Sequence, residues 1–357
     1  MELKAQLESE GIPVTLQNVN LETPDVSSGM RVRIPEHDLP LALRIIENTD
    51  IFRSNDSEHQ ESSHSILVPV DFSEHSLKGA KVAFRIAAAH NADIVIIHSY
   101  IDPYIGSNIQ LSDALTFDIS AEAEARRQVE QSSKTQMNIF CNRLRSLIKE
   151  GALPPVKFES RVVEGVPEDT IDEYAKINTP YIIVMGTRGS DRKNEEMIGS
   201  VTAEVLDKCR VTVLSVPENF DLERSYSPRN ILFLTNLDQG DILALDTMSR
   251  IFDKIDANVT LAQVTGKRRA FERTVKGDLS GLMRYCTKNY RRFTFDECDV
   301  PVEKDLNELY RIIRERHIDL IVVPNKKRRT LLGRLLNPGL AQRLVMGADV
   351  PMLVIRV

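Results

Sequence analysis

Three glycines and a serine carry the spacing of a phosphate-binding loop. They are Gly186, Gly189, Gly199 and Ser200, spaced as GxxG, nine residues, and then Gly-Ser. Glycine lets a backbone approach a ligand closely, and a helix start offers free N–H donors at the positive end of the helix dipole. The spacing fits neither the P-loop nor the Rossmann GxGxxG fingerprint. The stretch therefore predicts a phosphate-binding loop of another type, with Ser200 as the N-cap of the next helix.

The elements that would hold this loop form an alternating pattern of strands and helices. Asp71 directly follows one apolar strand and Gly186 follows another. Alternation of this kind predicts a doubly wound parallel sheet, in which ligands bind outside the carboxyl ends of the strands. Strands are expected at 66–70, 94–97, 156–163, 181–185 and 211–216, and helices at 73–87, 121–150, 167–176 and 200–208. The span 102–120 is expected to be a long loop.

Two segments together resemble the ATP-binding pattern of the universal stress protein family. One is Ser65-Ile-Leu-Val-Pro-Val-Asp71-Phe-Ser-Glu-His-Ser76, and the other is the glycine loop from Gly186 to Ser200. The resemblance covers residues 64–218 closely and residues 229–357 more weakly, as a second copy. It implies an α/β fold of two tandem doubly wound, adenine nucleotide alpha hydrolase-like domains.

The resemblance also implies roles for individual residues. Asp71 would accept a hydrogen bond from the adenine amino group, Ser99 would lie near the base, and the ribose would lie over Met185 and Gly186. Phosphates would be held by the N–H groups of Gly189, Gly199, Ser200 and Val201 and by the Ser200 hydroxyl, and Mg²⁺ would arrive with ATP. The implied nucleotide-binding residues are Pro69, Val70, Asp71, Ser99, Met185, Gly186, Arg188, Gly189, Gly199, Ser200 and Val201. The alternative interpretation is that the glycines serve only turns and a tight helix–strand contact.

Four regions are expected along the chain. Residues 1–54 predict a small α+β domain, with helices at 2–9 and 39–48 and strands at 12–16 and 30–34, and resemble domains of prokaryotic signal-transducing proteins. Residues 55–64 are polar and predict a linker. Residues 65–218 would form the domain with the ATP motif, and residues 229–357 the degenerate second domain.

The second half repeats the strand pattern without the binding residues. Asn236 stands where the first half has Asp71, and Pro324, Lys327, Asn337 and Pro338 replace the loop glycines and the serine. Proline cannot donate an N–H, and none of these residues has the conformational freedom of glycine. We therefore expect the second half to bind no nucleotide.

Composition excludes several classes of protein. The chain has 357 residues, 42% of them hydrophobic and 27% charged, with a net charge of −6, which is typical of globular domains. The acidic total gives no general reason to bind nucleic acid, and no apolar run reaches the roughly 20 residues of a membrane helix. Four scattered cysteines predict reduced thiols in a cytoplasmic protein. His98 lies at a strand end and could approach a ligand, but a lone histidine there is more often a structural or surface residue. No metal ligand is expected.

Three functions remain open on the sequence. The first is an ATP-binding regulatory or stress-response module that acts through protein partners and has no catalytic residues. The second is an enzyme, either a slow ATPase or a nucleotidyl transferase, although no catalytic set is evident. The third is a scaffold that binds no nucleotide, or a nucleic-acid binder that uses the basic residues from Lys267 to Arg292.

Each half ends in a strongly apolar segment, Val211–Val216 in the first and Met352–Val357 in the second. An apolar strand at the edge of a sheet leaves unpaired N–H and C=O groups and promotes aggregation. We expect the two segments to pair antiparallel within one chain, in place of the homodimer that single-copy relatives form. The alternative is pairing between chains in a larger oligomer.

Overall fold

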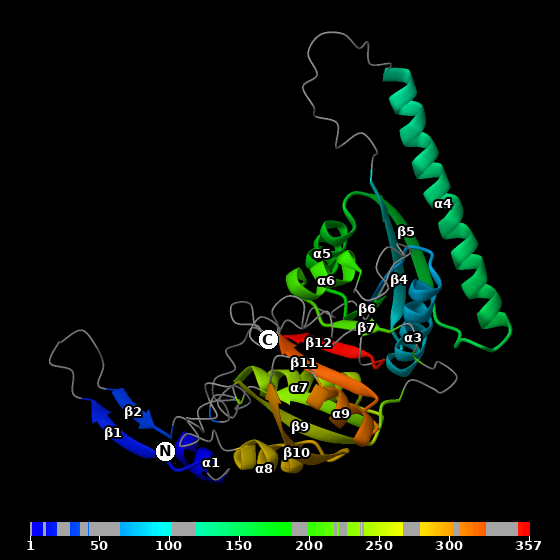
Figure 1. Cartoon of the computed structure of the whole chain (residues 1–357). Helices are drawn as coiled ribbons and strands as arrows, with labels where there is room; N and C mark the ends of the chain where they lie inside the picture. The colour runs from blue at the N-terminus through cyan, green and yellow to red at the C-terminus, as the bar shows by residue number, and fades with distance from the viewer. Residues whose placement is uncertain are drawn as a thin grey trace.

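Ten strands of the described part of the chain form one continuous sheet (Figure 1). The computed structural model describes residues 2–9, 12–19, 29–35, 42, 65–101, 119–187, 199–217, 220, 227–235, 237, 239–266, 279–302, 307–325 and 349–357. The strands of the sheet are β3 (Ser65–Pro69), β4 (Asp93–Tyr100), β5 (Phe158–Glu164), β6 (Ile182–Gly186), β7 (Val213–Val216), β8 (Asn230–Thr235), β9 (Ala257–Gly266), β10 (Phe293–Val302), β11 (Leu320–Asn325) and β12 (Met352–Arg356). Their spatial order is β10-β9-β8-β11-β12-β7-β6-β3-β4-β5.

The two halves of this sheet have the same strand order and register. In the first half β3 lies between β4 and β6, and in the second half β8 lies between β9 and β11; all neighbours within a half are parallel. Ile66 pairs with Ile182, and Ile231 in the same way pairs with Leu320. The α/β fold with a parallel sheet, predicted from the alternation of elements, is confirmed.

The halves join through one antiparallel pair at the middle of the sheet. β7 pairs with β12, with Leu214 opposite Leu353, and the Ser215 hydroxyl donates to the Met352 carbonyl at 3.3 Å. Both leucines are completely buried. Pairing of the two terminal strands within one chain, predicted from their apolar sequences, is confirmed.

Successive residues of a strand point to opposite faces of the sheet, and here both faces carry apolar side chains. Helices therefore cover both faces. One apolar cluster includes Ile66 and Val68 under α3 and α4, and extends to α7 and α8 of the second half. The other includes Leu67 under α5 and α6, and extends to α9. The helices are α3 (Glu74–His90), α4 (Ile119–Lys149), α5 (Pro167–Asn178), α6 (Ser200–Lys208), α7 (Gln239–Ile251), α8 (Leu279–Asn289) and α9 (Asn307–Glu315).

Local sequence explains where the helices of the first half begin and end. Ser73 caps α3 by accepting the Ser76 N–H, and Asn91 ends the helix in the left-handed region. Pro167 opens α5, where its missing N–H costs nothing, and Thr179 ends it in the left-handed region. The predicted helices at 73–87 and 167–176 are confirmed, as is the long helix, which is 31 residues in α4.

The N-terminal residues form a unit of their own. Helix α1 (Glu2–Ser9) precedes strands β1 (Thr15–Val19) and β2 (Gly29–Arg33), which pair antiparallel. Leu7, Ile12, Val14 and Ala42 make its small core. Strand β1 begins three residues later than predicted. The predicted loop 102–120 is wrong at its end, since residues 119 and 120 already belong to α4. Its residues 102–118, the predicted linker 55–64 and, apart from Ala42, the predicted helix 39–48 lie outside the described residues.

Candidate functional site

The first component of the site is the turn that follows β3. The Asp71 carboxylate accepts at Oδ1 from the Ser73 N–H at 3.1 Å and from the Ser73 hydroxyl at 2.6 Å. Ser73 is in turn the cap of α3. The carboxylate is thereby fixed in orientation beside the first turn of a helix, at the carboxyl end of a central strand.

A histidine of β4 packs against a phenylalanine of this turn. The His98 Nδ1 is 2.8 Å from the Val70 carbonyl oxygen, and the His98 ring packs at 4.2 Å from the ring of Phe72. Phe72 has a left-handed backbone, with φ of 67°. Burial lowers the pKa of His98 below its ordinary value of 6.5, which favours the neutral ring. Of the roles that the sequence leaves open for His98, these contacts fit a structural one.

The end of β6 forms the second component, and it packs tightly against α3. A Cβ on Gly186 would lie 2.9 Å from the His75 carbonyl oxygen, and a Cβ on Gly79 would lie 3.1 Å from the Gly186 nitrogen. Gly186 is therefore required here by the close approach of strand and helix. The tight helix–strand contact, considered in the sequence as an alternative to ligand binding, exists at this glycine.

The start of α6 is the third component. The Thr202 hydroxyl donates to the Gly186 carbonyl at 2.9 Å, and the Gly199 N–H donates to the Thr187 carbonyl at 2.9 Å. Two predictions are thereby wrong. The N-cap of α6 is Gly199 and not Ser200, which is the first residue of the helix. In addition, the Gly199 N–H is used inside the protein and does not point to a phosphate.

The helix start nevertheless keeps donors that its own ladder does not use. Gly199 has no side chain, so no side-chain cap covers the first turn of α6. The N–H groups of Ser200 and Val201 precede the first intrahelical bond, which runs from the Ala203 N–H to the Gly199 carbonyl at 3.0 Å. Binding of phosphate by these two N–H groups stays a prediction.

The structure brings most of the predicted residues to one edge of the sheet. β6, β3 and β4 are neighbours, and Pro69 pairs with Ile97, so that Asp71 and Ser99 lie at the same level. The described residues at this edge are Pro69, Val70, Asp71, Ser99, Met185, Gly186, Gly199, Ser200 and Val201. Arg188 and Gly189 lie outside the described residues. Sequence reasoning missed Thr202, whose place in the first turn of the predicted helix was the signal that could have found it.

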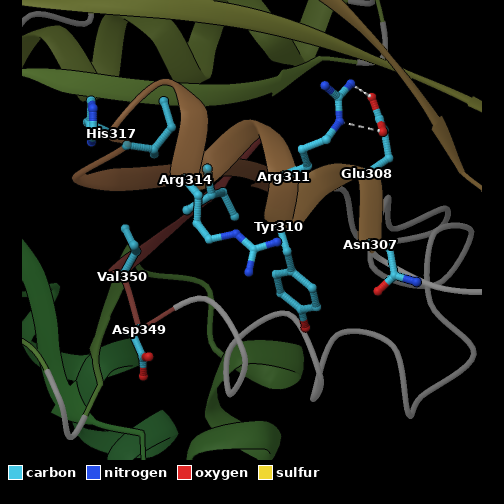
Figure 2. Close-up of a pocket in the computed structure, with 10 residues that line it drawn as sticks. Asn307, Glu308, Tyr310, Arg311, Arg314, His317, Asp349 and Val350 are labelled. Carbon is cyan, nitrogen blue, oxygen red and sulfur yellow. Dashed lines mark hydrogen bonds and ion pairs between the residues drawn. The ribbon is translucent and has the colours of Figure 1, made fainter.

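A pocket of about 820 Å³ lies away from this edge, in the second half (Figure 2). Side chains of α9 and the residues before β12 line it, among them Asn307, Tyr310, Arg311, Arg314, His317, Asp349 and Val350. In the first half the register-equivalent helix, α5, packs against α6, where Ile171 and Val205 share a core and Lys208 approaches Asp169 at 3.9 Å. The pocket therefore corresponds to a helix-packing surface, and we assign no ligand to it.

Metal and redox chemistry find little support in the described part of the chain. No group of three or more His, Cys, Asp or Glu side chains there could hold a metal ion. The four cysteines are free thiols, as predicted, and burial raises the pKa of Cys286 to about 12. Among the helices described, none is long and apolar enough to cross a membrane.

Comparison with known proteins identifies relatives of the first half. The model of the universal stress protein family matches residues 63–217. A universal stress protein of Methanocaldococcus jannaschii is 27% identical over 179 residues, which are 49% of this chain and 92% of the relative. One of Thermus aquaticus is 27% identical over 154 residues, 43% of this chain and 97% of the relative.

A solved structure is similar over more of the chain. The crystal structure of a universal stress protein from Archaeoglobus fulgidus superposes with a TM-score of 0.55 at 14% identity. The match covers 82% of this chain and 98% of that protein, so it extends beyond either half of the sheet alone. At this identity the similarity shows the fold.

Proposed function

Because residues 63–217 form a universal stress protein family domain, we propose that this domain binds ATP and acts as a regulatory module through protein partners. Binding would take place in the crevice at the carboxyl edge of β3 and β6, where the strand order changes direction. The base would meet Asp71, and the phosphates would meet the start of α6. Mg²⁺ would accompany the triphosphate, since it commonly binds through substrate phosphates.

The observation that carries the proposal is the convergence of complementary groups at this crevice. A carboxylate oriented by Ser73 is a fixed acceptor, which suits an exocyclic amino group. The uncapped start of α6 offers N–H donors and a positive dipole end, which suit phosphate. The α3 and α6 helices lie on opposite faces of the sheet, so one helix flanks this edge on each face.

We further propose that the second half is a degenerate copy of the domain and binds no nucleotide. Pro324 of β11 is the register equivalent of Gly186. Proline has no N–H and a fixed φ, so this strand end cannot reproduce the contacts of its counterpart. The chain would then hold one nucleotide.

Isothermal titration with ATP tests both proposals. We expect about one ATP per chain if each intact loop supplies one anion pocket. Gly189→Val is expected to abolish binding, because a β-branched side chain blocks close approach of the loop backbone to phosphate. A stoichiometry near two would contradict the degenerate second half, and full binding by Gly189→Val would contradict the role of the loop.

The identity of the base needs a separate variant. Asp71→Asn keeps an acceptor for Ser73 but replaces one carboxylate oxygen by an amide N–H₂, which repels the amino group of adenine. We expect about tenfold weaker ATP binding, the loss of roughly one charge-assisted hydrogen bond. AMP, cAMP and GTP in the same titration identify the preferred nucleotide, and phosphate release measured over hours distinguishes binding from slow hydrolysis.

A further inference from the structure

His98 connects the ends of two neighbouring strands. The Val70 carbonyl can only accept a hydrogen bond, so the Nδ1 atom 2.8 Å away carries the proton and donates. On the other side of the same residue, the Val70 N–H donates to the Ile97 carbonyl at 2.9 Å. The last residue before Asp71 is therefore held to β4 through both its N–H and its C=O.

The residue after Asp71 is held by the same ring. Phe72 adopts φ of 67°, a region that non-glycine residues seldom occupy without support from their surroundings. Its side chain lies 4.2 Å from the His98 ring and 6.0 Å from Phe140 of α4, centroid to centroid. The aromatic packing supplies the support that this conformation requires.

Asp71 stands between these two restrained residues. We infer that His98 is a positioning residue for nucleotide recognition, which aims the Asp71 carboxylate at the base by fixing the backbone on both sides of it. The inference depends on the proposed function of the crevice. His98 would act through Val70 and Phe72 and would not touch the nucleotide.

The second half holds the same turn without a histidine. Register places Gln263 at the position of His98 and Leu237 at the position of Phe72. Leu237 also has a left-handed backbone, with φ of 58°, and its N–H donates to the Thr235 hydroxyl at 3.0 Å. Thr235 donates onward to Asp241 at 2.6 Å. The turn at Leu237, for which no ligand contact is predicted, is thus held by the Thr235 hydroxyl. The turn at Phe72 is held by the His98 ring, and its Asp71 carboxylate stays at the edge of the sheet.

Three substitutions of His98 distinguish loss of the hydrogen-bond donor from loss of side-chain volume. Asparagine places an amide N–H near the position of Nδ1, glutamine places it one bond farther, and leucine has no donor. We expect His98→Leu and His98→Gln to bind ATP about three- to tenfold more weakly, as for one lost hydrogen bond, and His98→Asn to stay within about twofold of the parent. The ATP-to-GTP affinity ratio is expected to fall in the first two variants and to recover in His98→Asn. Gln263→Leu, the matched change in the second half, is expected to alter neither quantity.

Hydrogen exchange of the free protein supplies a readout that needs no nucleotide. The amides of residues 70–76 are expected to exchange faster in His98→Leu and His98→Gln than in His98→Asn. Should His98→Leu fail to fold, the glutamine and asparagine pair still decides the question. Equal exchange and an equal ATP-to-GTP ratio in these two variants would overturn the positioning role while leaving ATP binding intact. A parent protein that binds no adenine nucleotide would instead overturn the proposed function, and the role of His98 with it.

Discussion

The two halves of the sheet share a fold but differ where their strands end. In the first half Asp71 follows β3, and its carboxylate is oriented by Ser73, the cap of α3. In the second half the carboxyl group of Asp241, on α7, is completely buried and accepts from the Thr235 hydroxyl. The position of Asp71 is taken by Asn236 in the second half, so the edge carboxylate has no counterpart there.

Other features of the backbone are the same in both halves. The left-handed residues Phe72 and Leu237 occupy equivalent turns, and Thr179 and His317 occupy equivalent positions before β6 and β11. The first pair lies where a strand leads into a helix and the second where a helix leads into a strand, so these turns belong to the fold and persist when the chemistry changes. Backbone geometry therefore identifies the fold, and only the side chains at the strand ends identify a site.

The junction of the halves offers the largest test of their mutual dependence. Deletion of Pro351–Val357 removes β12 and leaves both β7 and β11 with an unpaired edge. It also removes the completely buried side chains of Leu353 and Ile355 from the apolar cluster under α3 and α7. We expect aggregation or a dimer formed through β7, because an exposed apolar edge pairs with another chain. Light scattering after size-exclusion chromatography measures the result.

Arg356→Ala, at the end of the same strand, is the control and is expected to keep the oligomeric state of the parent. A truncated protein that was monomeric, with intact secondary structure by circular dichroism, would show that the edge of β7 does not need to pair with β12.

Sequence reasoning predicted the sheet well because buried parallel strands are short apolar runs with clear boundaries. Tyr181–Met185 and Ile66–Val70 are of this kind, and β6 and β3 begin within one residue of them. The apolar character of both terminal strands also predicted their pairing. Prediction was poorer for β1, where Ile12 and Val14 join the small core before the strand begins.

The site was predicted as a set of residues, and the errors concern which group each residue uses. Gly199 was expected to donate to phosphate, but its N–H satisfies the Thr187 carbonyl, a contact between residues twelve apart that no spacing reveals. Gly186 packs against α3, since the need for a small residue looks the same in sequence whether a ligand or a helix approaches. The support of Phe72 by His98 also depends on a neighbouring strand and left no local signal.

The glycine at the end of β6 gives the next test. Gly186→Ala would place a Cβ 2.9 Å from the His75 carbonyl oxygen, and backbone on one side must shift. We expect the free energy of unfolding to fall by about 2–3 kcal/mol, the upper part of the range for overpacking, and ATP binding to weaken with it. Pro324→Ala, the matched change in the second half, adds no atoms and is expected to leave ATP affinity unchanged. Urea denaturation and titration together measure both variants; equal stability of Gly186→Ala and the parent would show that the helix moves freely away from β6.

The internal hydroxyl of the second half is tested by Thr235→Val, which introduces the residue type found at Val70. The variant keeps the side-chain shape but loses the donor to Asp241 and the acceptor for the Leu237 N–H. We expect the free energy of unfolding to fall by about 1–2 kcal/mol, as for hydrogen bonds lost in a buried place. ATP affinity is expected to stay within experimental error, because the change lies in the half without a predicted site. A change in affinity would indicate that the halves are coupled across β7 and β12.

The smallest expected effect concerns an ion pair that the second half cannot form. Glu74 at the start of α3 binds Arg143 of α4 at 2.5 and 3.1 Å, whereas the equivalent residue of α7 is Gln239. Both charged side chains are at least half exposed, so the pair contributes only about 0.2–1 kcal/mol. Glu74→Gln makes the first half like the second at this position and is expected to lower the free energy of unfolding by that amount at pH 7.

The pH dependence of this difference gives the decisive comparison. The hydrogen bond from Arg143 lowers the pKa of Glu74 below its ordinary value of 4.5. A carboxyl group whose pKa is lowered by folding stabilises the protein above its unfolded pKa, and the contribution disappears as the pH falls through the folded value. The parent and Glu74→Gln should therefore differ at pH 7 and converge in acid below the folded pKa of Glu74, and 1 M salt should reduce the difference at pH 7. A difference that persists in acid would assign the effect of Glu74 to packing and not to its charge.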